Sequence, residues 1–167
     1  MANTLQVAKS GESDLVMARN FDAPRALVFD AFTKPDLVKR WLLGPPGWSM
    51  PVCEMDVRVG GRYRWRWRNN ENGAEFGFSG TFREVQPPSR LVHTEAYDPG
   101  TVGDDFPKND AIVTVTFAAG GERTTVTTLV DFGSKQARDA AVATGMTDGM
   151  EESYQLLDRL LAEQPRA

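Results

Sequence analysis

The sequence is poor in the residues that build metal centres and covalent cross-links. Among its 167 residues there is one cysteine, Cys53, and one histidine, His93. A single cysteine cannot form an internal disulfide, and a zinc site would need thiolate and imidazole ligands that this chain hardly has. We therefore expect no disulfide, no metal site and no cofactor.

Long apolar runs and an excess of positive charge are also missing. No stretch approaches the roughly eighteen consecutive apolar residues of a transmembrane helix, and the first ten residues lack the apolar segment of a signal peptide. The formal net charge is −4 and the sequence pI is about 5.1, which argues against nucleic acid or an anionic membrane as a partner. We expect a soluble, cytoplasmic protein.

What is present is the composition of one globular domain spanning residues 1–167, with 41% hydrophobic and 25% charged residues. Period-two patterns predict a first strand at 14–21 and, after two short helices, a meander of antiparallel strands. The second of these helices follows Thr33-Lys-Pro-Asp36, which resembles a capping box. The six meander strands are expected at about 51–58, 61–69, 75–86, 90–97, 111–119 and 123–132.

The strand at 61–69 shows the clearest alternation. Arg62, Arg64, Arg66 and Arg68 alternate with aromatic residues, so one face is cationic and the other aromatic. A single-stranded nucleic-acid platform would carry charge and aromatic rings on the same face, which is not the arrangement here. We expect the arginines outside and the following side chains inside: Tyr63, Trp65, Trp67, Phe76, Phe78, Val113, Val115 and Phe117.

A long amphipathic helix is predicted at 145–163, and its apolar face has two chemically different halves. The C-terminal half is rich in leucine, whereas the N-terminal half carries Met146, Met150 and Tyr154. Flexible methionines and a partly polar ring suit the wall of a cavity better than a solid core, although an irregular core is the alternative. We predict an α+β fold in which a curved antiparallel sheet wraps around this helix.

Catalytic motifs are scarce. His93 lies on a predicted strand, and there is neither a Gly-x-Ser-x-Gly elbow nor a pair of histidines. A lone histidine on a strand is more often a hydrogen-bonded wall residue than a catalyst. No catalytic residue is assigned, and whether the protein is an enzyme stays open, with binding favoured.

Several strings in the chain resemble those of a known family: Phe21–Thr33, Trp41 before Gly44-Pro45, Cys53–Arg62, Gly80–Leu91 and Thr144–Leu160. In this order they are similar to bacterial proteins related to the C-terminal domain of the activator of Hsp90 ATPase, in the START-like, Bet v 1-like (SRPBCC) superfamily. The resemblance covers about residues 14–163. It implies a helix-grip fold with a cavity between the sheet and the last helix, but no single function, because relatives include lipid carriers, cyclases and co-chaperones.

From these patterns we expect the cavity to bind a small apolar, aromatic ligand without chemistry. One alternative is an enzyme of the cyclase or hydrolase type that uses cavity side chains such as His93. A chaperone-associated interaction module is a less favoured alternative, and a homodimer is left open. The segment 98–110 is a candidate flap. The expected ligand-binding residues are Tyr63, Trp65, Trp67, Phe76, Phe78, His93, Val115, Phe117, Met146, Met150 and Tyr154.

Overall fold

The computed structural model describes residues 3–98 and 110–164, so most of the candidate flap at 98–110 lies outside the described residues. One antiparallel sheet of eight strands dominates the fold, in the order β1-β2-β8-β7-β6-β5-β4-β3. Its strands are β1 (Gln6–Ser10), β2 (Asp14–Phe21), β3 (Trp48–Met55), β4 (Arg62–Asn69), β5 (Glu75–Gln86), β6 (Arg90–Asp98), β7 (Ala111–Gly120) and β8 (Arg123–Asp131).

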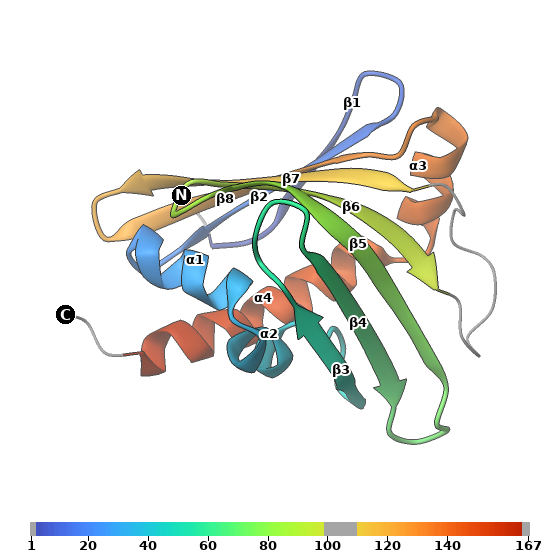
Figure 1. Cartoon of the computed structure of the whole chain (residues 1–167), viewed down its shortest axis with the longest axis horizontal. Coiled ribbons are helices and arrows are strands. Elements are labelled where there is room, and N and C mark those ends of the chain that lie inside the picture. The colour runs from blue at the N-terminus through green and yellow to red at the C-terminus, as the bar shows by residue number, and fades with distance from the viewer. Residues whose placement is uncertain (1–2, 99–109, 165–167) are drawn as a thin grey trace.

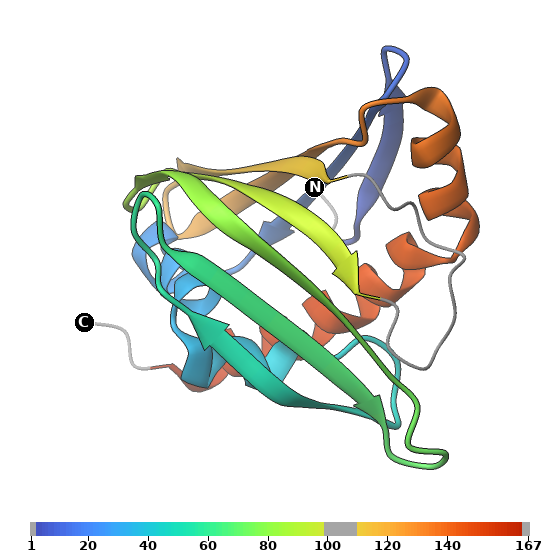
Figure 2. The same ribbon diagram turned by 45° about the vertical axis from the view of Figure 1, so that its right-hand side comes forward.

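Four helices complete the structure: α1 (Arg25–Thr33), α2 (Pro35–Trp41), α3 (Lys135–Ala143) and α4 (Met146–Glu163). In Figure 1, α4 runs beneath the sheet with α1 and α2 beside it, and Figure 2 shows the strands arching over it. This is the helix-grip arrangement, and the predicted fold class is confirmed. Within residues 3–98 and 110–164, no helix combines the length and the apolar character needed to cross a membrane.

The first strand, β1, was not predicted from the sequence. All five of its residues are exposed, and it pairs only with β2, with Gln6 opposite Ala18. Because neither face of β1 is buried, its sequence carries no alternation of apolar and polar residues that could reveal it. The seven predicted strands all exist, and the sheet has one more.

The core fills one end of the sheet, between β2, β7 and β8 above and α1 and α4 below. Leu15, Phe21 and Val28 are completely shielded from solvent, as is Leu157 of α4. Phe117 of β7 packs edge-on against Phe29 and Phe32 of α1, with ring centroids 5.2 Å apart in both pairs. Dense aromatic packing makes this end of the structure solid.

The start of α2 differs from the predicted capping box. The residue preceding α2 is Lys34, and no side chain caps the helix. The hydroxyl of Thr33 instead donates to the carbonyl oxygen of Phe29, one turn earlier in α1, at 2.8 Å. Pro35 occupies the first turn of α2 and has no N–H that needs a cap, so the helix can begin without one.

The two faces of β4 divide as predicted. Tyr63 and Trp67 are buried and Trp65 is half-buried, whereas Arg62, Arg64 and Arg68 are exposed. Arg66 also lies on the outer face but is largely covered, because its guanidinium pairs with Glu75 of β5 and Asp98 of β6. The aromatic side of the strand therefore faces the interior of the grip.

A close crossing of backbones curves the sheet over α4. A Cβ atom built on Gly80 of β5 would lie 1.9 Å from the carbonyl oxygen of Thr94, so only glycine fits there. The pairing of β5 with β6 also shifts in register between Phe82 and Glu84. Such irregularities bend strands, and here the bend turns β3 to β6 towards the N-terminal half of α4.

Candidate functional site

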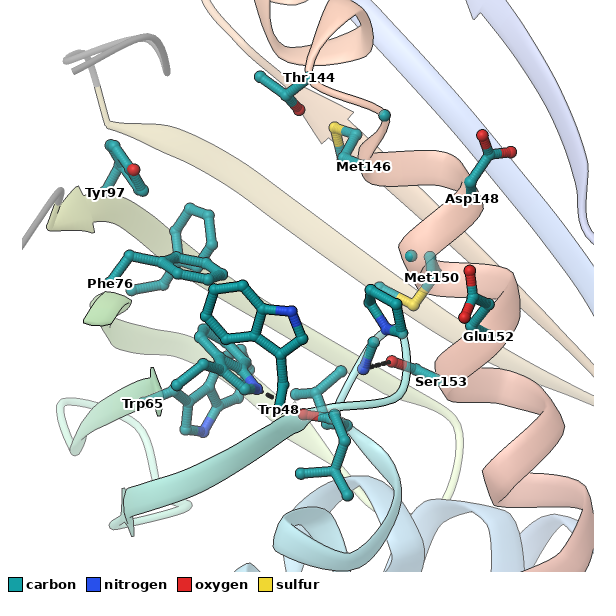
Figure 3. Close-up of a pocket in the computed structure, with 18 of the residues that line it drawn as sticks. Trp48, Trp65, Phe76, Tyr97, Thr144, Met146, Asp148, Met150, Glu152 and Ser153 are labelled. Atoms are coloured by element: carbon teal, nitrogen blue, oxygen red, sulfur yellow. Dashed lines mark hydrogen bonds between the residues drawn. The ribbon is translucent and has the colours of Figure 1, made fainter. Parts of the chain in front are cut away.

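An open cavity of about 860 Å³ lies between the bent half of the sheet and the first turns of α4. Figure 3 shows it as a gap between aromatic side chains on one side and the helix on the other. Strands β3 to β6, the loop after α2 and the junction of α3 with α4 provide the lining residues: Leu42, Leu43, Gly44, Pro45, Trp48, Trp65, Trp67, Phe76, Phe78, Glu95, Tyr97, Ala140, Ala143, Thr144, Gly145, Met146, Asp148, Gly149, Met150, Glu152 and Ser153.

The sheet side of the cavity is a continuous wall of aromatic rings. Phe76 stacks on Trp67 with centroids 5.3 Å apart and meets Trp48 edge-on at the same distance. The ring centroids of Phe78 on β5 and Tyr97 on the neighbouring strand β6 are 5.4 Å apart. The indole N–H of Trp67 donates to the carbonyl oxygen of Leu42 at 2.6 Å, which fixes this ring to the loop after α2. The wall is therefore held in place without a ligand.

The helix side of the cavity carries methionine side chains in place of aromatic rings. Met146 and Met150 lie one turn apart on α4 and face the aromatic wall in Figure 3. One turn further on, the hydroxyl oxygen of Ser153 accepts a hydrogen bond from the backbone N–H of Gly44 at 2.7 Å. This bond attaches the loop after α2 to α4 and closes that end of the cavity. Methionine side chains can adjust to ligands of different shape.

Gly149 stands between these methionines and allows a simple test of the helix wall. A Cβ atom added there would have a single near neighbour, Cδ of Pro45 at 4.0 Å, which is an ordinary contact. Gly149→Ala is therefore expected to stabilise the protein by about 0.5–1 kcal/mol, because glycine within a helix costs that much relative to alanine. Urea denaturation would measure this, and a loss of stability would mean that the helix wall is tighter than described.

Two polar groups on the sheet side of the cavity lack hydrogen-bond partners in the described part of the chain. The indole nitrogen of Trp65 is buried and makes no hydrogen bond. The carboxyl group of Glu95, on β6, has no hydrogen bond or ion pair with a residue in the described part of the chain. Burial raises the pKa of Glu95 to about 7. Unpartnered polar groups in a wall of aromatic rings are rare, because leaving them unpaired costs free energy.

The raised pKa of Glu95 predicts how a neutral replacement would behave. Since the carboxyl group has a higher pKa in the folded than in the unfolded chain, its contribution to stability is present at acidic pH and is lost as the pH rises through about 7. We expect Glu95→Gln to be more stable than the wild type by about 1 kcal/mol at alkaline pH. Thermal melts should show this difference shrinking towards pH 5; a constant difference would argue against a buried carboxyl group.

Of the predicted ligand-binding residues, the structure brings together six in the cavity lining: Trp65, Trp67, Phe76, Phe78, Met146 and Met150. Val115 and Phe117 lie instead in the solid core under α1. Tyr154 is also in the core, 5.0 Å from Phe21 and 5.8 Å from Trp41 between ring centroids. Tyr63 and His93 are buried behind Trp65, outside the lining.

His93 acts as a structural link between β4 and β6 in this arrangement. The hydroxyl of Tyr63 donates its one proton to the carbonyl oxygen of Thr94 at 2.6 Å, so Nδ1 of His93, 3.1 Å from the hydroxyl oxygen and 3.0 Å from the carbonyl, is the donor. Burial lowers the pKa of His93 to about 4. The ring is therefore neutral at pH 7 and does not line the cavity.

Trp48, Glu95 and Tyr97 are among the lining residues that were not predicted from the sequence. The last two follow His93 at intervals of two residues on β6, so the alternation of the strand places them on the same inner face. That signal was available. Trp48 was missed because β3 begins at residue 48, before the predicted start at 51.

Comparison with known proteins now identifies the family. Residues 22–162 match the sequence model of the family described as Activator of Hsp90 ATPase homolog 1-like protein. The chain belongs to this family. The match spans α1 to α4 and includes every residue of the cavity lining. A comparison with curated proteins gives no match.

Solved structures from bacteria share the fold of this Activator of Hsp90 ATPase homolog 1-like chain. A protein from Rhodobacter sphaeroides is 30% identical over 96% of this chain and 99% of its own, with a TM-score of 0.86. A protein from Chromobacterium violaceum is 25% identical, covers 91% and 99% of the two chains, and has a TM-score of 0.77. A protein from Arthrobacter aurescens, at 22% identity over 96% and 93%, has a TM-score of 0.80 and shows the fold alone.

Proposed function

We propose that the protein binds a small, largely apolar ligand with aromatic character in the cavity between the sheet and α4, and does not transform it. The observation that supports this most is the aromatic wall, which is fixed by its own packing and faces two methionines across open space. Rigid rings offer a large contact area at a low entropy cost, and methionines adapt to the shape of the ligand. Concave, mostly apolar cavities with few polar groups are the usual form of small-molecule sites.

Titration with N-phenyl-1-naphthylamine, a neutral aromatic fluorophore, tests this proposal. We expect saturable binding of one molecule per chain, with enhanced probe fluorescence and quenching of tryptophan emission, since three of the four tryptophans line the cavity. Native mass spectrometry before and after extraction with organic solvent would show whether protein purified from cells carries a ligand. The absence of saturable binding, together with an empty cell-purified protein, would refute the proposal.

An enzyme of the cyclase or hydrolase type remains the second candidate, and one observation favours it. Glu95 lines the cavity, and its pKa of about 7 suits a general acid or base better than the pKa of about 4 of His93, which lies outside the lining. The thiol of Cys53 is a poor nucleophile, because burial raises its pKa to about 11. Recovery of a bound ligand with unchanged mass after prolonged incubation would support binding; a changed mass would support catalysis.

The family name suggests a third role, in association with a chaperone of the Hsp90 type. We place this role behind ligand binding, because the cavity supplies a specific geometry and no comparable feature among the described residues supports a chaperone surface. The ATPase activity of a bacterial Hsp90 homologue, measured with and without saturating amounts of the purified protein, decides between them. We expect no stimulation, and stimulation comparable to that by a known activator would establish the chaperone role.

A further inference from the structure

All charged side chains in the cavity lining have the same sign. They are Glu95 on β6 and Asp148 and Glu152 on α4, and no lysine or arginine occurs among the described lining residues. The arginines of β4 lie on the opposite face of the sheet, where Arg66 is already paired with Glu75. Figure 3 shows the side chains of Asp148 and Glu152 on the side of α4 that faces away from the aromatic wall, so Glu95 is the acid of the lining that lies within that wall.

Glu95 differs from the two acids on the helix because it sits within the aromatic wall. On the inner face of β6 it lies between His93 and Tyr97, and it has no polar partner in the described part of the chain. A carboxylate without a partner in such surroundings is unfavourable for the folded protein, and binding sites retain such groups for their ligands. A neutral or anionic ligand would leave this cost in place or increase it.

The aromatic rings provide a second feature that attracts positive charge. The faces of tryptophan, tyrosine and phenylalanine rings carry negative potential, and such rings form cages around ammonium groups. The ring of Tyr97, two residues after Glu95 on β6, has its centroid 5.4 Å from that of Phe78 on β5, and Trp65 of β4 is paired with Phe78 in the sheet. Rings and carboxylate thus occupy the same wall of the cavity.

The partial charges at the helix ends around the cavity do not cancel its attraction for positively charged groups. The N-terminus of α4 carries partial positive charge, but Asp148 lies in its first turn. The C-terminal residues Ala140 and Ala143 of α3 line the same part of the cavity, and the C-terminus of a helix carries partial negative charge. The two helix termini therefore offset each other where they meet.

We propose that the ligand is an amine, with an apolar aromatic body held between the aromatic wall and the methionines of α4 and a protonated amino group that binds the carboxylate of Glu95. This inference rests on the proposed function and specifies the chemical class of its ligand. Ammonium–carboxylate hydrogen bonds are stronger than neutral ones when both groups are withdrawn from water. Asp148 and Glu152 at the helix side add long-range attraction for a cation.

Three aromatic compounds that differ in one group test the inference: naphthylethylamine, naphthylethanol and naphthylacetate, each measured by calorimetry at about pH 8, where Glu95 is ionised. We expect the amine to bind about tenfold more tightly than the alcohol, the factor that a charge-assisted hydrogen bond supplies, and the acid to bind most weakly. Glu95→Gln should remove the advantage of the amine and leave the affinity for the alcohol within about twofold. Glu54→Gln, the same change at an exposed position of β3, should alter neither.

The pH dependence adds an independent readout. A primary amine stays protonated throughout the range from about pH 5.5 to 8, whereas Glu95, with a pKa of about 7, takes up a proton. Affinity for naphthylethylamine should therefore approach its full value at about pH 8 and fall as the pH is lowered through about 7, while affinity for naphthylethanol stays constant. Protonation of His93, with a pKa of about 4, lies outside this range. Other titratable side chains near Glu95 include Tyr63, on which the charges of Glu95 and Asp110 both act, and Tyr97, Asp148 and Glu152 of the cavity lining.

The outcomes separate the two proposals. If N-phenyl-1-naphthylamine binds but naphthylethylamine binds no more tightly than naphthylethanol, the inference of an amine ligand is refuted and the proposed binding function stands. If naphthylethylamine binds more tightly than naphthylethanol but Glu95→Gln leaves this difference in affinity unchanged, Glu95 does not bind the amino group and the inference is overturned. If neither the fluorophore nor any of the three compounds binds, both proposals fail.

Discussion

Arg19→Met is expected to destabilise the protein by about 3 kcal/mol, the lower end of the range for breaking a buried ion pair. Arg19 lies on β2 with its side chain 2% exposed, and its guanidinium binds Asp158 through two hydrogen bonds of 2.8 Å and Glu151 at 2.9 Å. The Cζ atom of the Arg19 guanidinium also lies 4.9 Å from the ring centroid of Phe21. These contacts join β2 to the middle of α4, beneath the solid end of the sheet. Removing the guanidinium leaves the partly exposed carboxylates of Glu151 and Asp158, at 22% and 37% exposure, without their shared partner.

Arg40→Met is the matched control. Arg40 also binds an acid of α4, Glu163 at 2.8 Å, but its side chain is 49% exposed and that of Glu163 is 62% exposed. Exposed pairs contribute about 0–1 kcal/mol, so this variant should resemble the wild type in urea denaturation. If the two variants lose equal amounts of unfolding free energy, or if Arg19→Met loses less than about 1 kcal/mol, the contacts of Arg19 with Glu151 and Asp158 do not hold α4 to the sheet.

The double variant Met146→Trp/Met150→Trp is expected to weaken the binding of N-phenyl-1-naphthylamine about a hundredfold, or about 2.7 kcal/mol. Both methionines face the aromatic wall, so two indole rings in their place would occupy the space that the ligand needs. Stability should stay level or rise, because apolar rings would fill open space against other rings. Fluorescence titration and a thermal melt of the same sample measure both effects.

Gln155→Trp controls for the added ring on the same helix. Gln155 is exposed and lies outside the cavity lining, so this variant should bind the fluorophore like the wild type. Undiminished binding by the double variant would place the fluorophore elsewhere on the protein. A large loss of thermal stability together with lost binding would show that the N-terminal half of α4, which carries Met146 and Met150, is part of the solid core.

The sequence predicted most of the fold because the strands and α4 each bury one face. In β4 the alternation of arginine and aromatic residues placed every side chain on the correct side of the sheet. The same reasoning missed β1, which buries neither face, and gave no role to Arg19, a charged residue at a buried position of β2. The position of Arg19 is understood only once Glu151 and Asp158 are seen across from it on α4.

The site was predictable only in part, because periodicity tells which face is buried but not whether the space it faces is filled. Met150 and Tyr154 share one face of α4, yet Met150 borders the cavity while Tyr154 is covered by Phe32 and Trp41. The helices α1 and α2 fill one half of the grip and leave the other half open. That division depends on how α2 and its loop attach to α4, as through the bond from Gly44 to Ser153.

Methionine methyl resonances test the central claim most directly. In protein labelled with carbon-13 at the methionine methyl groups, titration with N-phenyl-1-naphthylamine should shift the signals of Met146 and Met150, which line the cavity. The signals of Met17, buried in the core, and of Met55 on β3, which lies outside the lining, should stay in place and serve as internal controls. Saturable shifts confined to Met146 and Met150 are the predicted result. Shifts at Met17 or Met55 without any at Met146 and Met150 would contradict binding between the sheet and α4.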